Sequence, residues 1–198
     1  MTGDAAMQPV SRICARTFVL PAENVDTDQI IPARFLTTTR REGLGRHLFA
    51  DWRRDAAGRP REGFDLEEAN GAAILVAGRN FGCGSSREHA AWALADYGFR
   101  AVISTEIADI FRANALRNRL LPVVLSEPDV GWLMAHPGLE LCIDLEACLV
   151  ELPDGWRSPF DIDAFARRCL LEGVDPLGWL LGRDGDIAAY EEARACRP

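Results

Sequence analysis

The residue types with the clearest chemistry lie between Gly78 and His89, in the segment Gly-Arg-Asn-Phe-Gly-Cys-Gly-Ser-Ser-Arg-Glu-His. An apolar run, 72–77, precedes this segment, and a run of helical character, 90–97, follows it. This order predicts a strand, a glycine-rich turn and a helix. N–H groups in the first turn of a helix lack intrahelical acceptors, and the helix dipole favours negative charge there. The hydroxyls and guanidinium of Ser85-Ser86-Arg87 therefore indicate a site for an oxyanion or a carboxylate.

Simpler interpretations of the same segment stay open from the residues alone. The glycines are also typical of a tight loop, and either serine is a candidate helix N-cap, with Glu88 completing a capping box from Ser85. His89 lies one helical turn after Ser85, which leaves a Ser–His pair open, but the sequence assigns no orienting carboxylate. A phosphate-binding P-loop needs a Lys, and the chain has none. A nucleophile elbow needs a glycine two residues after its serine, and Arg87 and Glu88 follow here instead.

Composition narrows the class of protein. The chain has 198 residues, of which 48% are hydrophobic, so it can form one globular domain with a proper core. The formal net charge is −8 and the pI is about 4.9, which argues against nucleic acid as the main partner. A small anionic substrate remains compatible with this charge, because a site needs only a local excess of positive charge.

The six cysteines are dispersed and include no C-x-x-C pair, a pattern that suits neither zinc nor an iron–sulfur cluster held by this chain alone. No secretory peptide or membrane-spanning segment is recognisable. We therefore expect no metal on this chain, no membrane association, a cytoplasmic location and reduced thiols. For Cys83, inside the key turn, we expect the role of a small loop residue.

Hydrophobic runs predict the elements that must position this turn. Strands are expected at 14–20, 72–77, 101–104 and 121–125, with helices from about 86 to 97 and from about 106 to 117, the second capped by Thr105. Successive strand–helix–strand units imply a parallel sheet, and ligands collect at the carboxyl ends of such strands, where the Ser-Ser-Arg turn falls. Farther on, strands at 140–144 and 148–152 can pair antiparallel. Helices are expected at about 160–171, capped by Asp161 or Asp163, and at about 184–194.

Two segments before residue 72 are less regular. Asp26 and Asp28 alternate in Asn24–Pro32, a spacing compatible with a metal site, but Asp commonly hydrogen-bonds its own backbone in turns, so we favour a turn. Residues from about 37 to 70 are rich in Arg, Gly and acidic residues, and long irregular segments of this kind are often functional.

Several motifs in the same order give the chain a close resemblance to the 3-isopropylmalate dehydratase small subunits of bacteria. The resemblance runs from about Phe18 to the C-terminus. Its motifs are Asn24-Val-Asp-Thr-Asp-Gln-Ile-Ile-Pro32, Gly45-Arg-His-Leu-Phe-Ala-Asp-Trp-Arg53, Asn80-Phe-Gly-Cys-Gly-Ser-Ser-Arg-Glu-His89, Trp92-Ala-Leu-Ala-Asp-Tyr-Gly-Phe-Arg100, Ala108-Asp-Ile-Phe111 and Asp186-Ile-Ala-Ala-Tyr-Glu191.

The family is similar to the mobile C-terminal domain of aconitase. The resemblance implies an α/β fold, a swivelling β/β/α three-layer domain with a parallel βαβαβ core and additional antiparallel strands. It would span residues 1–198 as a single domain, with residues 1–10 expected to be disordered. The implied reaction interconverts 2-isopropylmalate and 3-isopropylmalate in leucine biosynthesis, by dehydration and rehydration. A large partner subunit would carry a 4Fe–4S cluster as the Lewis acid, and this chain would bind no cofactor itself.

The resemblance also implies roles for individual residues. Ser85 matches the base that takes the proton α to a carboxylate, which is plausible only where Arg87 and helix-terminal N–H groups stabilise its alkoxide. Ser86 matches a donor to substrate or to Ser85, and Arg87 a partner of a substrate carboxylate. Asp28 matches an acidic position that faces the active site, where it would orient a group of the partner subunit rather than bind a metal. The loop after Leu36 corresponds to the segment that selects the substrate side group, and the substrate-contact candidates near it are Arg34, Thr37 and Arg40.

One departure and two alternatives accompany this interpretation. Arg119 stands where the family usually has a glycine suited to a left-handed turn. A related dehydratase for a methylated or longer malate would use the same machinery with a different loop between Thr37 and Arg54. A non-catalytic module would use the Ser-Ser-Arg turn only to bind an anion.

Overall fold

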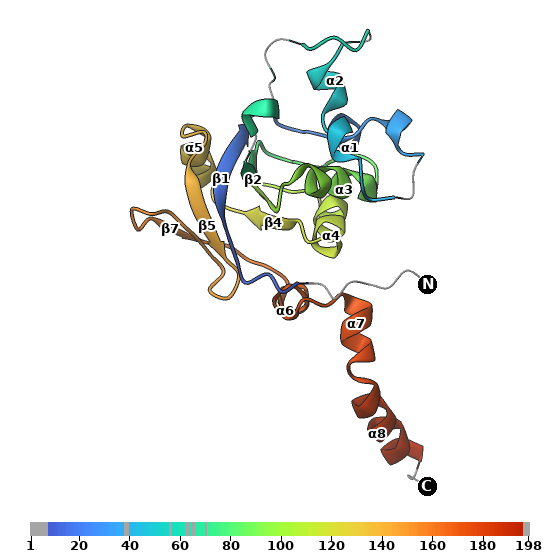
Figure 1. Ribbon diagram of the computed structural model, residues 1–198. Coiled ribbons are helices and arrows are strands. Elements are labelled where there is room, and N and C mark those ends of the chain that lie inside the picture. The colour runs from blue at the N-terminus through green and yellow to red at the C-terminus, as the bar shows by residue number, and fades with distance from the viewer. Residues whose placement is uncertain are drawn as a thin grey trace. The chain divides into compact units, whose positions relative to one another are not determined.

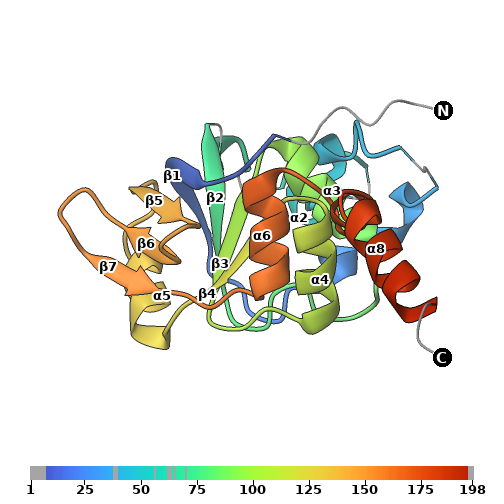
Figure 2. The same cartoon turned by 90° about the horizontal axis from the view of Figure 1, so that it is seen from below.

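A computed structural model of the protein describes residues 8–37, 40–55, 57–61, 64, 66–69 and 71–195. Its centre is a seven-stranded sheet with the order β4-β3-β2-β1-β5-β6-β7. Figure 2 shows the strands side by side in this order. The strands are β1 (Arg12–Leu20), β2 (Ala72–Ala77), β3 (Ala101–Ser104), β4 (Leu121–Val124), β5 (Glu140–Asp144), β6 (Leu149–Glu151) and β7 (Arg157–Pro159).

Strands β1 to β4 are parallel, as their sequences predict. The runs of β2 and β3 are apolar almost without interruption, and nearly all their side chains are buried, as expected for strands covered on both faces. Helices α3 (Glu88–Tyr97) and α4 (Asp109–Arg117) lie on one side of the sheet, while α5 (Glu127–Met134) packs against β1 and β2 on the other (Figure 1). The parallel core with added antiparallel strands is therefore confirmed.

Short elements connect β1 to β2 along the chain. They are the helices α1 (Thr27–Ile30) and α2 (Ala50–Arg53) and the 3₁₀ turns η1 (Ala33–Phe35), η2 (Gly45–His47) and η3 (Leu66–Ala69). Their apolar side chains, including the fully buried Ile30, Leu48 and Phe49, join the core below α3. The irregular region predicted between 37 and 70 thus contains short turns that are anchored by buried residues.

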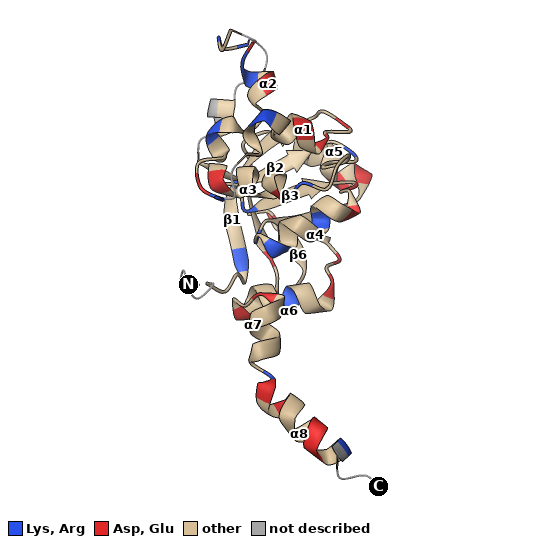
Figure 3. Ribbon diagram, turned by 90° about the vertical axis from the view of Figure 1, so that its right-hand side faces the viewer, with Lys and Arg blue, Asp and Glu red and all other residues tan. Residues whose placement is uncertain are grey.

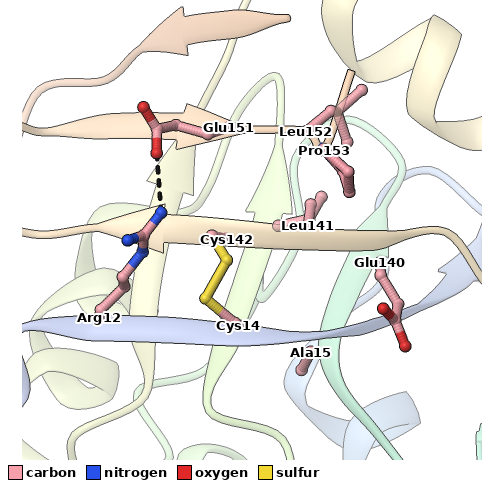
Figure 4. Close-up of a pocket in the computed structure, with 9 residues that line it drawn as sticks. All are labelled: Arg12, Cys14, Ala15, Glu140, Leu141, Cys142, Glu151, Leu152 and Pro153. Atoms are coloured by element: carbon pink, nitrogen blue, oxygen red, sulfur yellow. Dashed lines mark hydrogen bonds and ion pairs between the residues drawn. A yellow bond between two sulfur atoms is a disulfide. The ribbon is translucent and has the colours of Figure 1, made fainter. Parts of the chain in front are cut away.

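The antiparallel half of the sheet holds a disulfide. Cys14 of β1 and Cys142 of β5 are directly opposed in the register, with Cα atoms 4.0 Å apart and their sulfurs bonded. Figure 4 shows this bond beside the Arg12–Glu151 ion pair, which spans from β1 to β6. The expectation that all thiols are reduced is therefore wrong at this pair. The two cysteines are 128 residues apart, so their pairing depends on a strand register that the sequence does not reveal.

The chain divides into two compact units, one formed by residues 12–161 and the other by the two terminal segments. In the described part of the terminal unit, α6 (Ala164–Glu172), α7 (Pro176–Leu181) and α8 (Asp184–Ala195) follow one another. The N–H of Val10 donates to the carbonyl of Leu170 at 2.9 Å. The expected disorder of residues 1–10 falls mostly on residues 1–7, outside the described residues, and a single swivel domain over 1–198 stays a prediction.

Several predicted boundaries need correction. Helix α4 begins at Asp109 after Ala108, not at a cap on Thr105, because Ile107 and Ala108 are held in extended contact with Phe81. Helix α6 begins at Ala164 and is capped by Asp163, one of the two aspartates expected there. Helices α5 and α7 and strand β7 were not predicted. No helix among the described residues is long and apolar enough to cross a membrane.

Candidate active site

Two loops that follow neighbouring parallel strands are joined along their length. Residues 24–28 follow β1 and residues 78–87 follow β2. The N–H of Gly82 donates to the carbonyl of Val25 at 2.7 Å, and the N–H of Thr27 donates to that of Cys83 at 3.0 Å. Because these hydrogen bonds continue the β1–β2 pairing beyond the sheet, they fix the glycine-rich turn at the carboxyl edge, where the sequence placed it.

The hydroxyls of Ser85 and Ser86 are presented by this turn. Both residues are exposed, and neither hydroxyl makes a hydrogen bond within the described part of the chain. The backbone of Ser85 is fixed, because its carbonyl accepts a hydrogen bond of 3.0 Å from the buried hydroxyl of Thr27. The capping box between Ser85 and Glu88, which the sequence left open as an alternative, does not form: α3 begins after Arg87 without a side-chain cap. The serine side chains are thus left available for chemistry.

Arg87 and Asp28 meet across the two loops. Their side chains form an ion pair and hydrogen bond, with 21% of the Arg87 side chain and 50% of the Asp28 side chain exposed. Asp28 is held in place by its helix, since Asp26 and Gln29 form a complete capping box around α1. Asp26 therefore serves the turn, as favoured from the sequence, while Asp28 directs its carboxylate at the guanidinium.

The turn's shape depends on glycine at one buried point. Gly82 has a φ of +75°, and a Cβ placed there would lie 2.6 Å from the Cβ of Phe111 on α4. Cys83, the next residue, is half-buried, and its thiol donates to the carbonyl of Asn24. Burial and the nearby Asp26 carboxylate raise the pKa of the Cys83 thiol, which disfavours the reactive thiolate. This agrees with the expected role of Cys83 as a small loop residue.

The remaining predicted residues lie on the segment after α1. Arg34 is exposed and forms a two-point ion pair with Asp51 of α2, with N–O distances of 3.0 and 2.5 Å. The pair raises the pKa of Arg34 and lowers the pKa of Asp51. Thr37 and Arg40 are both exposed and flank two residues that are not described. The structure thus unites Asp28, Ser85 and Arg87 through the joined loops, whereas Arg34 is engaged by α2.

Some residues that build the site escaped sequence reasoning. Thr27 donates to the Ser85 carbonyl; it stands within the Asn24–Pro32 motif, but sequence reasoning assigned it no role. Asn24 and Asn80 both have positive φ, and their side chains are hydrogen-bonded to each other at 2.9 Å, which fastens the start of the two loops. The signal for these two was available, because asparagine is enriched in left-handed backbone. No group of three or more potential metal ligands occurs among the described residues.

Comparison with known proteins extends over nearly the whole chain. The family model for the Aconitase C-terminal domain matches residues 13–128, and that described as LeuD_N matches residues 133–164. A 3-isopropylmalate dehydratase small subunit from Anaeromyxobacter dehalogenans 2CP-C is 62% identical over 190 residues, which cover 95% of this chain and 100% of that protein. One from Chloroflexus aurantiacus J-10-fl is 54% identical over 191 residues, covering 93% and 95%.

A solved structure agrees with these relatives. The crystal structure of 3-isopropylmalate dehydratase (leuD) from Methanocaldococcus jannaschii aligns with a TM-score of 0.68 and 29% identity, covering 90% of this chain and 99% of that one. The chain therefore belongs to the family of 3-isopropylmalate dehydratase small subunits, and its fold is the swivel domain of the aconitase superfamily.

Proposed function

We propose that this chain is the small subunit of a 3-isopropylmalate dehydratase, a hydro-lyase of leucine biosynthesis that works together with a large subunit. The observation that carries the proposal is the 62% identity to a named small subunit along that protein's full length. The relatives favour this substrate over the methylated or longer malates and over a non-catalytic anion-binding module. We place the complex in the cytoplasm, as the sequence analysis expects.

The proposed chemistry of this chain is proton transfer and carboxylate binding. Arg87 would pair with a carboxylate of the substrate, and this pairing makes the hydrogen on the adjacent carbon more acidic. Ser85, whose hydroxyl is exposed and has no partner among the described residues, would take that proton as the base. An alkoxide is a poor species in water, so this role requires the nearby guanidinium and the first-turn N–H groups of α3 to stabilise the anion.

The other residues would orient the substrate and the partner. Ser86 would donate to the substrate or to Ser85, and Asp28 would align Arg87 and a group of the large subunit. Arg34, Thr37 and Arg40 stand near the segment that would read the isopropyl side group. A 4Fe–4S cluster on the large subunit would supply the Lewis acid for the departing hydroxyl. Within the described residues, this chain offers no set of three side chains for such a group.

An anaerobic assay tests the proposal. This chain is mixed with its large subunit, whose cluster has been reconstituted, and the absorbance of the alkene diacid is followed with 2-isopropylmalate and with methylmalates. Activity that needs both chains and is greatest with 2-isopropylmalate is expected. Greater activity with a methylmalate would reject the proposed substrate, and turnover by either chain alone would reject the shared site.

Two variants test the proposed roles. Ser85→Ala should abolish turnover while the two subunits still associate, and Ser11→Ala is the matched control on another exposed serine. Arg87→Lys should lose most of its activity, because an ammonium cannot reproduce a forked contact, and Arg100→Lys is its control. Normal turnover in Ser85→Ala would remove Ser85 as the base.

A further inference from the structure

A cavity of about 530 Å³ lies between η1, η2, α2 and the segment after α2. This volume is within the range of about 300–1,000 Å³ typical of small-molecule sites. Its wall contains none of Asp28, Ser85, Ser86 or Arg87. Five arginines line the cavity: Arg34, Arg46, Arg53, Arg54 and Arg61. His47, Phe35, Asp51 and Asp55 also contribute to its wall. Figure 3 shows basic and acidic residues together on α2, which forms part of this wall.

Both carboxylates in the wall already have partners. Asp51 receives two hydrogen bonds from Arg34, and Asp55 forms an ion pair of 2.7 Å with Arg59, which lies outside the cavity lining. Asp55 also accepts hydrogen bonds from the backbone N–H groups of Ala57 and Arg59. Each of the two carboxylates is therefore already paired with one arginine.

The other four arginines have no carboxylate within ion-pair distance among the described residues. Arg53 donates to the carbonyls of Arg46 and Leu48, and Arg54 donates to that of Gly58. Arg46 donates to the ring of His47 at 3.0 Å. The side chain of Arg61 makes no hydrogen bond within the described part of the chain. Among the described residues, four guanidiniums therefore line one cavity without a carboxylate in ion-pair contact, in a protein whose net charge is −8.

The arginines also act electrostatically on the titratable groups beside them. Burial lowers the pKa of His47, and the charges of Arg46, Arg34 and Arg53 lower it further. A neutral His47 ring can accept the hydrogen bond from Arg46, whereas an imidazolium would add a further positive charge to the cavity. Hydrogen bonds from Arg34 and Arg59 lower the pKa of Asp51 and Asp55 respectively, and the charge of Arg61 lowers both pKa values further.

From this arrangement we infer that the cavity binds a small multivalent anion that carries carboxylate or phosphate groups. Guanidinium groups match both through forked hydrogen bonds, and several converging arginines favour an anion with more than one negative charge. Arg53 and Arg54 are held in place by backbone carbonyls, so less conformational entropy is lost when they bind. The inference concerns binding only and does not depend on turnover.

The cavity adjoins the segment proposed to select the substrate side group. Phe35 stacks on His47 with ring centroids 3.9 Å apart, and the Arg34 guanidinium lies 4.6 Å from the Phe35 ring centroid. An anion that draws Arg34 from Asp51 would therefore act on residues 33–37. This part of the inference rests on the proposed function, and binding itself is measured separately from it.

The experiment is calorimetric titration of the full-length subunit with pyrophosphate, citrate and acetate at low salt. Saturable binding of pyrophosphate or citrate, far tighter than that of acetate, is expected, and affinity should fall with added NaCl. Binding of pyrophosphate alone would indicate a phosphate-bearing ligand, and binding of citrate alone a polycarboxylate. The absence of saturable binding with both would overturn the inference.

Variants locate the bound anion. Removing two guanidiniums in Arg46→Gln/Arg61→Gln should weaken binding by about tenfold or more. The control Arg100→Gln, which removes one exposed positive charge elsewhere, should bind as the wild type does. Arg87→Gln should also bind normally, and an equal loss there would place the anion at the Ser-Ser-Arg turn and refute the inference.

Thermal unfolding, measured with and without anion, separates loss of binding from loss of stability in the double variant. Without anion, the double variant should unfold at the same or a higher temperature than the wild type, because repulsion in the cavity is reduced. With pyrophosphate or citrate, the wild type should gain thermal stability and the double variant should not. An equal gain in both proteins would show that the anion acts elsewhere.

Discussion

Gly82→Ala is the substitution whose cost follows most directly from the geometry of the joined loops. Gly82 has a φ of +75°, a conformation that costs an L-residue about 1–2 kcal/mol. The added methyl group would lie 2.6 Å from the Cβ of Phe111 and nearer still to its ring. Phe111 is 1% exposed and packs edge-on against Phe81, so it has little room to move. Overpacking of this kind typically costs about 1–3 kcal/mol, and the total expected is about 2–5 kcal/mol.

Gly84→Ala separates the two contributions. Gly84 also has a positive φ, of +87°, but a Cβ there would have only ordinary contacts, the nearest at 3.4 Å from the Cβ of Asp26. This control should therefore cost about 1–2 kcal/mol from backbone strain alone. The excess loss in Gly82→Ala, about 1–3 kcal/mol, measures the collision with Phe111.

The free energy of unfolding of both variants is measured by urea denaturation, followed by circular dichroism. An unchanged m-value, the slope of this free energy against urea concentration, confirms that the variants and the wild type can be compared directly. In a Phe111→Leu background the cost of Gly82→Ala should shrink, because the smaller side chain leaves room for the methyl group. A cost for Gly82→Ala no greater than for Gly84→Ala would refute the reasoning, and so would the same cost in the Phe111→Leu background.

Three other features give simpler predictions. Arg119 has a φ of +59°, so Arg119→Gly should be more stable than Arg119→Ala by about 1 kcal/mol in urea unfolding, and equal stability would contradict the assigned strain. Reduction of Cys14–Cys142 should lower the melting temperature, because the bond closes a long loop, while Cys14→Ser should not respond to reductant. His47 should titrate below its usual pKa of about 6.5 by NMR, since its charged form is disfavoured. The contribution of neutral His47 to the free energy of unfolding should be complete above about pH 6.5, the usual pKa. It should be lost as the pH falls through the lower pKa of His47 in the folded protein, and an unshifted NMR titration of His47 would contradict this.

The parallel core could be predicted because its signals are local. Runs such as 72–77 and 101–104 are apolar and short, and each is followed by a glycine-rich turn or a helix pattern. These features decide the strand type and the crossover handedness without knowledge of distant residues. The place of the Ser-Ser-Arg turn at the carboxyl edge followed from the same logic.

The capping of α1 and α3 shows where local signals compete. Asp26 and Gln29, like Ser85 and Glu88, have the spacing of a capping box, but only the first pair forms one. The carbonyl of Ser85 is held by Thr27, and the backbone remains extended until Arg87. A tertiary hydrogen bond thus decides between two equal local patterns, and a single sequence does not contain that information.

The disulfide and the arginine cavity lay beyond prediction for a different reason. Cys14 and Cys142 meet only because β1 and β5 adopt one antiparallel register among several. The arginines of the cavity come from segments with charge patterns that are typical of solvated loops. Only the fold shows that two aspartates pair with Arg34 and Arg59 and leave the rest without a carboxylate.

The ion pair between Arg87 and Asp28 links the fold to the proposed chemistry. Arg87 is mostly buried, and a guanidinium in that position without a carboxylate would be costly, so Asp28 stabilises the unliganded turn. Under the proposed function, a substrate carboxylate that approaches Arg87 would share or replace this partner. Because Asp28 is half exposed, the released carboxylate can face solvent at modest cost. In the proposed chemistry, the two loops hold the guanidinium for a substrate anion, and the Ser85 hydroxyl, which has no hydrogen-bond partner among the described residues, is carried on a fixed backbone two residues before it.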